Sequence, residues 1–287
     1  MKVLLTGATG FTGSYVVPLL LDKGHEVACF VRSSSSTDSL LCDRLELRRG
    51  DFNDPQSLKQ ALIGREALIN VASLGFGHAP AIVQAAEAAG IRRAIFVSTT
   101  AVSTTLNAAS KLVRLAAEDT IRQSALAYTI LRPTMIYGSP RDRNITRLIR
   151  YVRRWPVIPV FGDGKSLQQP VHVQDVANAI VQALHSEVAV GNTYNLSGAA
   201  PVTYNELIDT VCRLLNRNVH KIHVPSAPIV QALRGFERVG LRLPIKSEQI
   251  LRLNENKAFD YAAAQRDFGY QPRTVDEGVR QQIKSAE

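Results

Sequence analysis

Short apolar runs alternate with segments of helical period through the first half of the chain. Six runs have the length and composition of strands, at Val3–Thr6, Glu26–Val31, Leu45–Arg49, Ala67–Val71, Ala94–Ser98 and Tyr128–Arg132. Between them, apolar residues recur every three or four positions over Gly13–Lys23, Pro55–Leu62, Pro80–Ala89 and about Ala108–Gln123. Strands that alternate with helices predict βαβ units, and therefore a doubly wound α/β fold around a parallel sheet.

The pattern is less regular after Arg132, where prolines and glycines are frequent. Three further helices are predicted, at Ile145–Arg154, about Val173–Leu184 and about Tyr204–Leu215. We expect a large sheet domain over residues 1–133, completed by about 171–200. A smaller α+β cap is expected over residues 134–170 and 201–287.

Three glycines at three-residue spacing follow the first strand and open the first helix. Gly7 permits a tight turn, Gly10 lets backbone N–H groups approach a pyrophosphate, and Gly13 lets the helix sit close to the strand. Because a helix N-terminus attracts anions, this loop predicts a dinucleotide site. The residues that we expect to contact the dinucleotide here are Gly7, Thr9, Gly10, Phe11, Thr12 and Gly13.

The ends of the next strands indicate which dinucleotide binds. Arg32 stands where an NAD-selective protein usually has an acid, and an arginine can pair with a 2′-phosphate, so NADP is predicted, with NAD as the alternative. Asp51 is placed to contact the adenine amino group, with Phe52 beside it. Ala72 and Ser73 follow the fourth strand and are expected to line the path of the ribose and pyrophosphate.

Taken together, these motifs resemble the short-chain dehydrogenase/reductase superfamily in its extended and atypical branches. The similarity rests on Gly7 to Gly13, Gly50-Asp51, Phe96 to Thr99, Tyr128 to Pro133, Ile136-Tyr137-Gly138, Val171 to Ala177 and Asp267 to Tyr270. It implies a Rossmann domain with cofactor contacts from Ser98, Lys111, Pro133 and Ile136. It also implies a second domain that holds the substrate, commonly a nucleotide-diphosphate sugar. Proteins of this type include epimerases, dehydratases, NmrA-like regulators and the accessory subunit of respiratory complex I that holds NADPH without turning it over.

The superfamily's catalytic tyrosine has no counterpart in this chain. Ser98 or Thr99 matches the upstream hydroxyl. If Lys111 is the family's lysine, Asn107 stands at the tyrosine position; if the register follows Glu118, Ser110 replaces the tyrosine and Arg114 the lysine. Neither replacement is an acid comparable with a tuned phenol, and loss of a positioned acid typically costs about 10²- to 10⁴-fold in rate. The standard dehydrogenase mechanism is therefore not expected.

Other side chains are candidates for the missing chemistry. Tyr137 follows the sixth strand, and either lies near the nicotinamide end or packs beneath the cap. His78 follows the fourth strand, and Lys111 itself would act as a base if burial removed its charge. His220 and His223 lie three apart on a predicted strand and face opposite sides, so no metal site is predicted.

The excess of positive charge is concentrated in one stretch. The net charge is +9, and residues 132–154 hold seven arginines and one aspartate, a net +6. Arg143, Arg147, Arg150 and Arg154 are spaced by four, three and four, which predicts a basic helix face. Its expected partner is a phosphate-bearing small-molecule substrate, a peripheral membrane or a protein surface, or solvent. Nucleic acid is not expected, because no recognition helix or aromatic series accompanies the charge.

Composition limits the remaining choices. Three cysteines at unrelated spacings and the absence of a targeting or spanning segment favour a cytoplasmic protein without disulfides. Two hypotheses follow. The chain is either an atypical NADP-dependent oxidoreductase or epimerase on a small carbonyl or hydroxyl, with Ser98, Lys111 and Tyr137 as catalytic candidates, or a non-catalytic module that holds NADPH and docks on a partner or membrane.

Overall fold

A seven-stranded parallel sheet organises the chain. The computed structural model describes residues 1–40, 44–106, 109–238 and 246–285. The strand order is β11-β6-β5-β4-β1-β2-β3, and every neighbouring pair is parallel. The strands are β1 (Lys2–Thr6), β2 (Glu26–Val31), β3 (Leu45–Arg49), β4 (Ala67–Asn70), β5 (Arg93–Val97), β6 (Tyr128–Pro133) and β11 (Thr193–Leu196). This order confirms the predicted doubly wound α/β fold.

All six strands expected from the sequence are present, and β11 is a seventh. It pairs with β6 from Thr193↔Ile130 to Leu196↔Pro133 and so extends the sheet at one edge. Its four residues, Thr-Tyr-Asn-Leu, are too few and too mixed in polarity to read as a strand on their own. The prediction of six strands was therefore one short.

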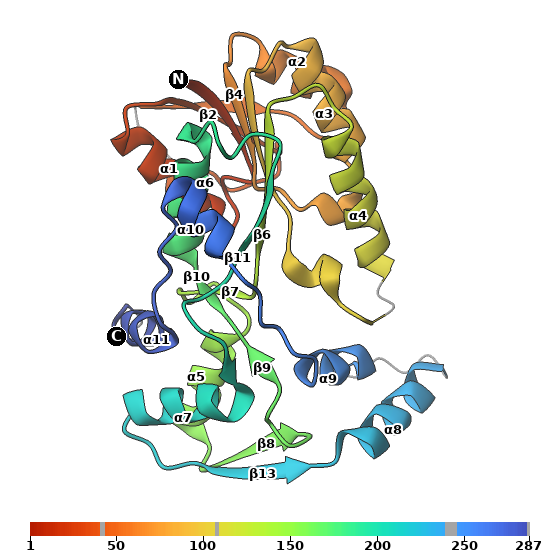
Figure 1. Cartoon of the computed structure of the whole chain (residues 1–287), viewed down its shortest axis with the longest axis vertical. Helices are drawn as coiled ribbons and strands as arrows, with labels where there is room; N and C mark the ends of the chain where they lie inside the picture. Colours follow the sequence, from red (N-terminus) through yellow and green to blue (C-terminus); the bar gives the residue numbers. More distant parts are fainter. Residues whose placement is uncertain (41–43, 107–108, 239–245, 286–287) are drawn as a thin grey trace.

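Helices cover both faces of the sheet (Figure 1). One face carries α2 (Pro55–Leu62), α3 (Ala79–Ala88) and α4 (Ala109–Arg122), and the other carries α1 (Gly13–Asp22), α6 (Val173–His185) and α10 (Ala262–Phe268). Each face has its own buried apolar cluster. These two layers are what a parallel sheet, apolar on both faces, requires.

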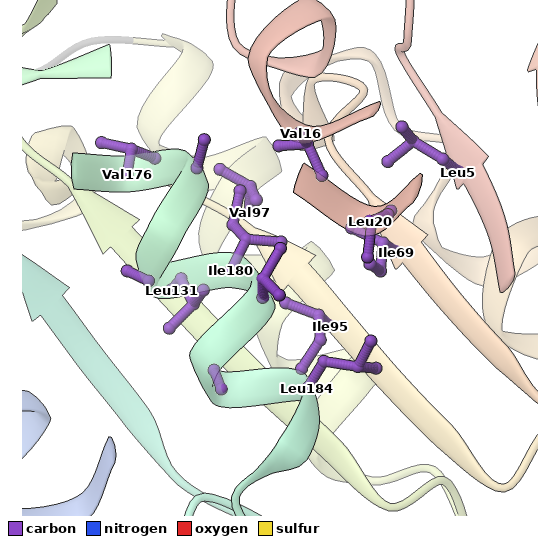
Figure 2. Close-up of a cluster of buried hydrophobic side chains, with 14 of the residues drawn as sticks. Leu5, Val16, Leu20, Ile69, Ile95, Val97, Leu131, Val176, Ile180 and Leu184 are labelled. Atoms are coloured by element: carbon purple, nitrogen blue, oxygen red, sulfur yellow. The ribbon is translucent and has the colours of Figure 1, made fainter. Parts of the chain in front are cut away.

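The packing of α6 on the sheet shows how the apolar residues that recur along the sequence form the buried core. Val176, Ile180 and Leu184 recur every four residues, so they share one helix face and point at the sheet (Figure 2). They meet the fully or almost fully buried side chains Ile95, Val97 and Leu131 of β5 and β6, while Val16 and Leu20 of α1 cover Leu5 and Ile69. This layer holds the carboxyl ends of the strands in fixed register.

The remaining elements gather beyond the carboxyl edge of the sheet, and we call them the cap elements (Figure 1). They are β7 (Ile136–Tyr137), α5 (Ile145–Arg154), β8 (Val157–Phe161), β9 (Leu167–Gln168), β10 (Val171–His172), β12 (Val202–Thr203), α7 (Tyr204–Leu214), β13 (His220–Val224), α8 (Ser226–Arg238), α9 (Ser247–Leu253) and α11 (Val275–Lys284). A third apolar cluster joins β7, α5, β8, α7 and α11 among them. Within the described residues, none of the helices is both long and apolar enough to cross a membrane.

Candidate functional site

The glycine loop between β1 and α1 has a backbone that tolerates no side chain at two positions. Gly7 has φ +73°, and a Cβ there would stand 2.8 Å from the amide nitrogen of Ala72. A Cβ on Gly13 would stand 2.1 Å from the carbonyl oxygen of Gly7. Gly10 is exposed, and its N–H donates to the carbonyl of Gly7 at 2.9 Å. The close approach of loop, strand and helix brings the loop backbone to the N-terminus of α1, an arrangement that fits the pyrophosphate of a dinucleotide.

A buried hydrogen-bond chain fixes the neighbouring strand ends. The Thr6 hydroxyl donates to Oδ1 of Asn70 at 2.7 Å, and Nδ2 of Asn70 donates to the carbonyl of Ala72 at 3.0 Å. Both side chains are fully buried. Ala72 and exposed Ser73 are thereby held beside Gly7, at the place the sequence predicted for a ribose and pyrophosphate path.

Two guanidinium groups stand where β2 and β3 end. Arg32 is exposed just beyond β2. Arg49, paired in register with Val31, donates from Nη1 to the carbonyl of Ser33 at 3.3 Å. We did not predict Arg49 as a site residue, although the adjacency of the second and third strands contained the signal. The two cations lie next to the position expected for the adenosine ribose.

The predicted adenine contacts lie in one group. The carboxylate of Asp51 accepts from the backbone and side-chain nitrogens of Asn53, at 2.8 and 2.9 Å. Phe52 packs between Phe30 and His78, with ring centroids 5.4 and 5.3 Å away. His78 therefore belongs to this aromatic group, and the structure does not bring it to the reaction end.

One cap residue reaches the glycine loop directly. Nη2 of Arg141 donates to the carbonyl of Thr9 at 2.7 Å, and Nη1 donates to the hydroxyl of Ser14 at 3.4 Å. The sequence analysis counted Arg141 only as part of a basic stretch. No local pattern reveals this contact, because it joins residues more than 120 positions apart.

A cavity of about 220 Å³ lies where β5 and β6 end. Hydroxyl groups of Thr99, Thr100 and Thr134 belong to its sheet side, and Glu255 and Lys257 to the opposite side. Burial lowers the pKa of Lys257, whose ammonium donates to Oε1 of Gln168 at 3.2 Å. Glu255 accepts from the Thr104 hydroxyl and the Thr105 amide. We call this cavity the reaction pocket. The sequence gave no signal for Glu255 or Lys257, which stand in an irregular segment.

Ser98 is held away from the reaction pocket by a buried ion-pair network. Its hydroxyl donates to Oε1 of Glu118 at 2.6 Å, and Glu118 is fully buried. Burial alone raises the pKa of that carboxyl, but hydrogen bonds from Arg132 and Ser98 lower it overall. Of the two hydroxyls offered for the upstream position, Thr99 is therefore the one that lines the pocket. The expectation that Ser98 faces substrate is not met in this structure, because its hydroxyl is committed to Glu118.

Lys111 and Arg114 lie on α4 but do different things. The Lys111 ammonium donates to the carbonyl of Thr104, at the rim of the reaction pocket, at 2.5 Å. Arg114 lies over the loop after β4, where a Cβ on Gly75 would stand 3.0 Å from its Nη2. Burial lowers the pKa of Arg114. Ser110 is partly buried on the same helix, and Asn107 lies outside the described residues.

Tyr137 does not reach the reaction pocket. The side chain is 1% exposed and its ring packs edge-on against His172. A Cβ on Gly278 of α11 would stand 1.9 Å from its hydroxyl, which has no hydrogen-bond partner among the described residues. Burial raises the pKa of Tyr137. The prediction of Tyr137 as a proton donor is corrected on this geometry, because a phenol sealed beneath α11 cannot deliver a proton to a substrate.

The two remaining predicted contacts lie at the sheet edge. Pro133 ends β6, and its carbonyl accepts from the Thr100 hydroxyl at 3.4 Å. Ile136 is partly buried against the apolar cluster that includes α1 and α6. Both are close in sequence to Thr134, which lines the reaction pocket.

The predicted basic helix face keeps Arg147, Arg150 and Arg154 on α5, but Arg143 precedes the N-cap and is not part of the helix. Arg143 and Arg147 line a second cavity of about 450 Å³, and Arg150 and Arg154 are exposed outside it. The second cavity shares Met135, Arg252 and Lys257 with the reaction pocket, so the two adjoin. Among the side chains the structure describes, no group of three or more His, Cys, Asp or Glu is arranged to hold a metal ion.

The glycine loop, the strand order and the sheet edge agree with known proteins. A family model described as NAD(P)H-binding matches residues 7–187. The chain belongs to this family. The resemblance to atypical short-chain dehydrogenases/reductases is thereby confirmed, and an NAD(P)-binding domain is established.

Similar proteins within this group have different activities. The mitochondrial NADH dehydrogenase [ubiquinone] 1 alpha subcomplex subunit 9 of Arabidopsis thaliana is 29% identical over 88% of this chain and 68% of its own. A ceramide reductase of Caulobacter vibrioides is 33% identical over 80% of this chain and 75% of its own. The structure of a Thermotoga maritima UDP-glucose 4-epimerase with UDP-glucose superimposes with a TM-score of 0.77, covering 100% and 98% of the chains at 18% identity. That likeness shows the fold.

Proposed function

We propose that this chain is an NADP(H)-dependent oxidoreductase acting on the carbonyl or hydroxyl group of a small substrate. The observation that carries the proposal is the reaction pocket, which lies at the carboxyl edge of the sheet with hydroxyl and ionisable groups on both sides. In doubly wound sheets, ligands bind at this edge. We further propose that residues 134–170 and 201–287 form the substrate domain over residues 1–133 and about 171–200.

The geometry supports the following proposed cofactor contacts. The glycine loop holds the pyrophosphate, Ala72 and Ser73 follow its path, and the exposed Arg32, with Arg49 beside it, pairs with a 2′-phosphate. The remaining proposed contacts are Asp51, Phe52, Lys111, Pro133 and Ile136. When bound, the cofactor supplies or accepts a hydride at its nicotinamide. Lys111, whose ammonium donates to the carbonyl of the pocket-lining Thr104, is proposed to bind the ribose.

Proton transfer in this proposal falls to Lys257 instead of a tyrosine. The Thr99 hydroxyl, which accepts from the backbone N–H of Ala101 at 3.2 Å, supplies the donor that polarises a carbonyl, as the upstream serine does elsewhere. Lys257 lines the same pocket, and its lowered pKa brings an ammonium proton closer to neutral pH than that of an exposed lysine. Glu255 keeps a negative charge in the pocket, since hydrogen bonds from Thr104 and Thr105 outweigh the effect of burial and lower its pKa.

The test is NADPH oxidation with a panel of ketones and aldehydes. We expect turnover in the wild type, and a loss of about 10²- to 10⁴-fold in kcat for Lys257→Met with unchanged NADPH affinity. Lys165→Met is the matched control, because Lys165 is exposed outside the pocket. Thermal shift with NADPH reports binding separately, through ligand linkage. No shift with either NADPH or NADH would refute the cofactor site itself.

A second candidate function is a non-catalytic NADPH-holding module. It is favoured by the commitment of Ser98 to Glu118 and the burial of Tyr137, which leave the family's usual chemistry without its groups. The similarity to a subunit of NADH dehydrogenase is compatible with it. On this reading exposed Arg150, Arg154 and Trp155 form a docking face for a protein or an anionic membrane. Tight NADPH binding without oxidation by any carbonyl would favour this candidate.

A further inference from the structure

The second cavity combines an apolar wall with unpaired cations. It lies between α5 and α7 on one side and α9 on the other, with β8 and β9 between them (Figure 1). Its apolar lining is Met135, Ile145, Leu148, Phe161, Leu207, Ile250 and Leu253. Arg143 and Arg147 also line it, and neither is paired with an acid in the part of the chain that the structure describes. Among the described residues that line the cavity, none is acidic.

Two of the polar side chains that line the cavity, Gln168 and Gln249, are committed to the protein itself. Gln168 accepts from Lys257 at 3.2 Å, and its Nε2 donates to the carbonyls of Leu253 and Glu255 at 3.4 Å. Gln249 accepts from the backbone N–H of Lys246 at 2.9 Å. A ribose or a nucleobase has hydrogen-bonding groups along its edge, and its binding site must offer free donors and acceptors to pair with them. Burying such a group without a partner costs free energy. These two glutamines therefore offer little to a polar ligand, and the lining contains more apolar side chains than polar ones with free groups.

We propose that this cavity binds an anionic amphiphile, namely an aliphatic chain that carries a phosphate. The chain occupies the apolar wall, where water is displaced from hydrocarbon. The phosphate pairs with Arg143, which directly precedes the N-cap of α5, and with Arg147 on α5, because both line this cavity. Arg252 lines both cavities, and a ligand seated here would reach the reaction pocket past Met135 and Lys257.

This inference deepens the proposed function, on which it rests, by naming the substrate class. Its test uses the full chain saturated with NADPH and isothermal titration with butyl phosphate, octyl phosphate, inorganic phosphate and UDP-glucose, each below any micelle concentration. Octyl phosphate is expected to bind on the order of 100-fold more tightly than butyl phosphate, since each buried methylene contributes roughly threefold to fourfold. Inorganic phosphate and UDP-glucose are expected to bind more weakly than octyl phosphate.

Two variants test the contact with the phosphate and the contact with the aliphatic chain of the ligand separately. Arg147→Gln should weaken octyl phosphate about 10-fold, whereas Arg150→Gln, on the same helix but outside the cavity, should not. Leu253→Asn should flatten the dependence on chain length. Tighter binding of UDP-glucose, or equal binding of butyl and octyl phosphate, overturns the inference. Because NADPH binding is measured first on each sample, its loss would identify failure of the proposed function instead.

Discussion

The glycine loop and the reaction pocket lie at the same edge of the sheet, but they depend on different properties of the chain. In the loop, Gly7 and Gly13 act by having no side chain, and the backbone provides the contacts. In the pocket, the proposed chemistry depends on individual side chains, and the family's phenol is absent from its usual place. A chain can therefore keep the cofactor site intact while its proton-transfer groups are replaced.

Glu118 belongs to a buried network that includes Ser98 but not the glycine loop, so a substitution of Glu118 tests one region without the other. It is fully buried and is bonded by Ser98, Arg122 and Arg132. Removing one member of a buried ion pair typically costs about 3–5 kcal/mol, because the remaining charges lose their partner. We expect Glu118→Ala to lower the free energy of unfolding by that amount in urea titrations, the largest effect predicted here.

The matched control is Glu248→Ala, which breaks an exposed i,i+4 pair with Arg252. Exposed pairs contribute about 0–1 kcal/mol, so little change is expected. In folded Glu118→Ala protein, NADPH affinity should stay near that of the wild type, because the glycine loop is not part of the network. Equal stability losses for the two variants would contradict the structural role assigned to Glu118.

We expect the stability of the cap elements to depend on pH through His172. Burial, and then the charge of Arg273, lowers the pKa of His172 from 6.5 to about 4. Its Nδ1 accepts the backbone N–H of Gln174 at 3.3 Å, and Nε2 has no partner among the described residues. Below pH 6.5 the His172 imidazole is protonated in the unfolded chain but stays neutral in the native state until the pH falls to about 4. Stability is thus present above pH 6.5 and declines by about 3 kcal/mol as the pH falls to about 4.

Unfolding titrations at pH 7, 5.5 and 4.5 measure this decline. His172→Asn keeps a side chain that can accept the Gln174 N–H and removes the titrating group, so its stability should depend less on pH. Part of the slope remains, because burial also lowers the pKa of His25. An unchanged slope in His172→Asn would show that His172 is not the group responsible.

The preference for NADPH over NADH tests the cofactor site, the first of the two regions compared. Arg32→Ser should weaken NADPH by about 10-fold, about 1.4 kcal/mol, and leave NADH unchanged, because only NADPH has the 2′-phosphate. Arg92→Ser removes the same charge from an exposed site that the structure pairs with Glu66, far from the β2 end, and serves as control. Competition binding with both dinucleotides measures the ratio. Equal losses for the two cofactors would remove Arg32 from the 2′-phosphate site.

The sequence predicted backbone features more reliably than side-chain directions. β2, β3, α2 and α5 have the expected bounds, since long apolar periods and turn residues define them locally. The short β11 was missed, because its identity as a strand depends on pairing with β6.

Long-range side-chain contacts could not be predicted from the sequence for the same reason. Ser98 and Tyr137 were identified as site candidates from the sequence. The sequence does not show that the Ser98 hydroxyl donates to Glu118 or that the Tyr137 hydroxyl faces α11. Arg141, which bonds to Thr9, and Lys257, which lines the reaction pocket, lacked any local signal. Such contacts join segments that only the folded sheet brings together.

Tyr137→Phe should have the smallest effect, and it tests the correction made to the reaction end. Its hydroxyl has no partner among the described residues, so removing it should change the free energy of unfolding by less than about 1 kcal/mol and leave NADPH oxidation unchanged. Gly278→Ala supplies the complementary change, because its Cβ would collide with that hydroxyl and cost about 1–3 kcal/mol. In the double variant this cost should shrink, which a double-mutant cycle measures. If Tyr137→Phe instead abolished oxidation without loss of stability, the phenol would be the proton donor after all, and the two regions would share the usual mechanism of the family.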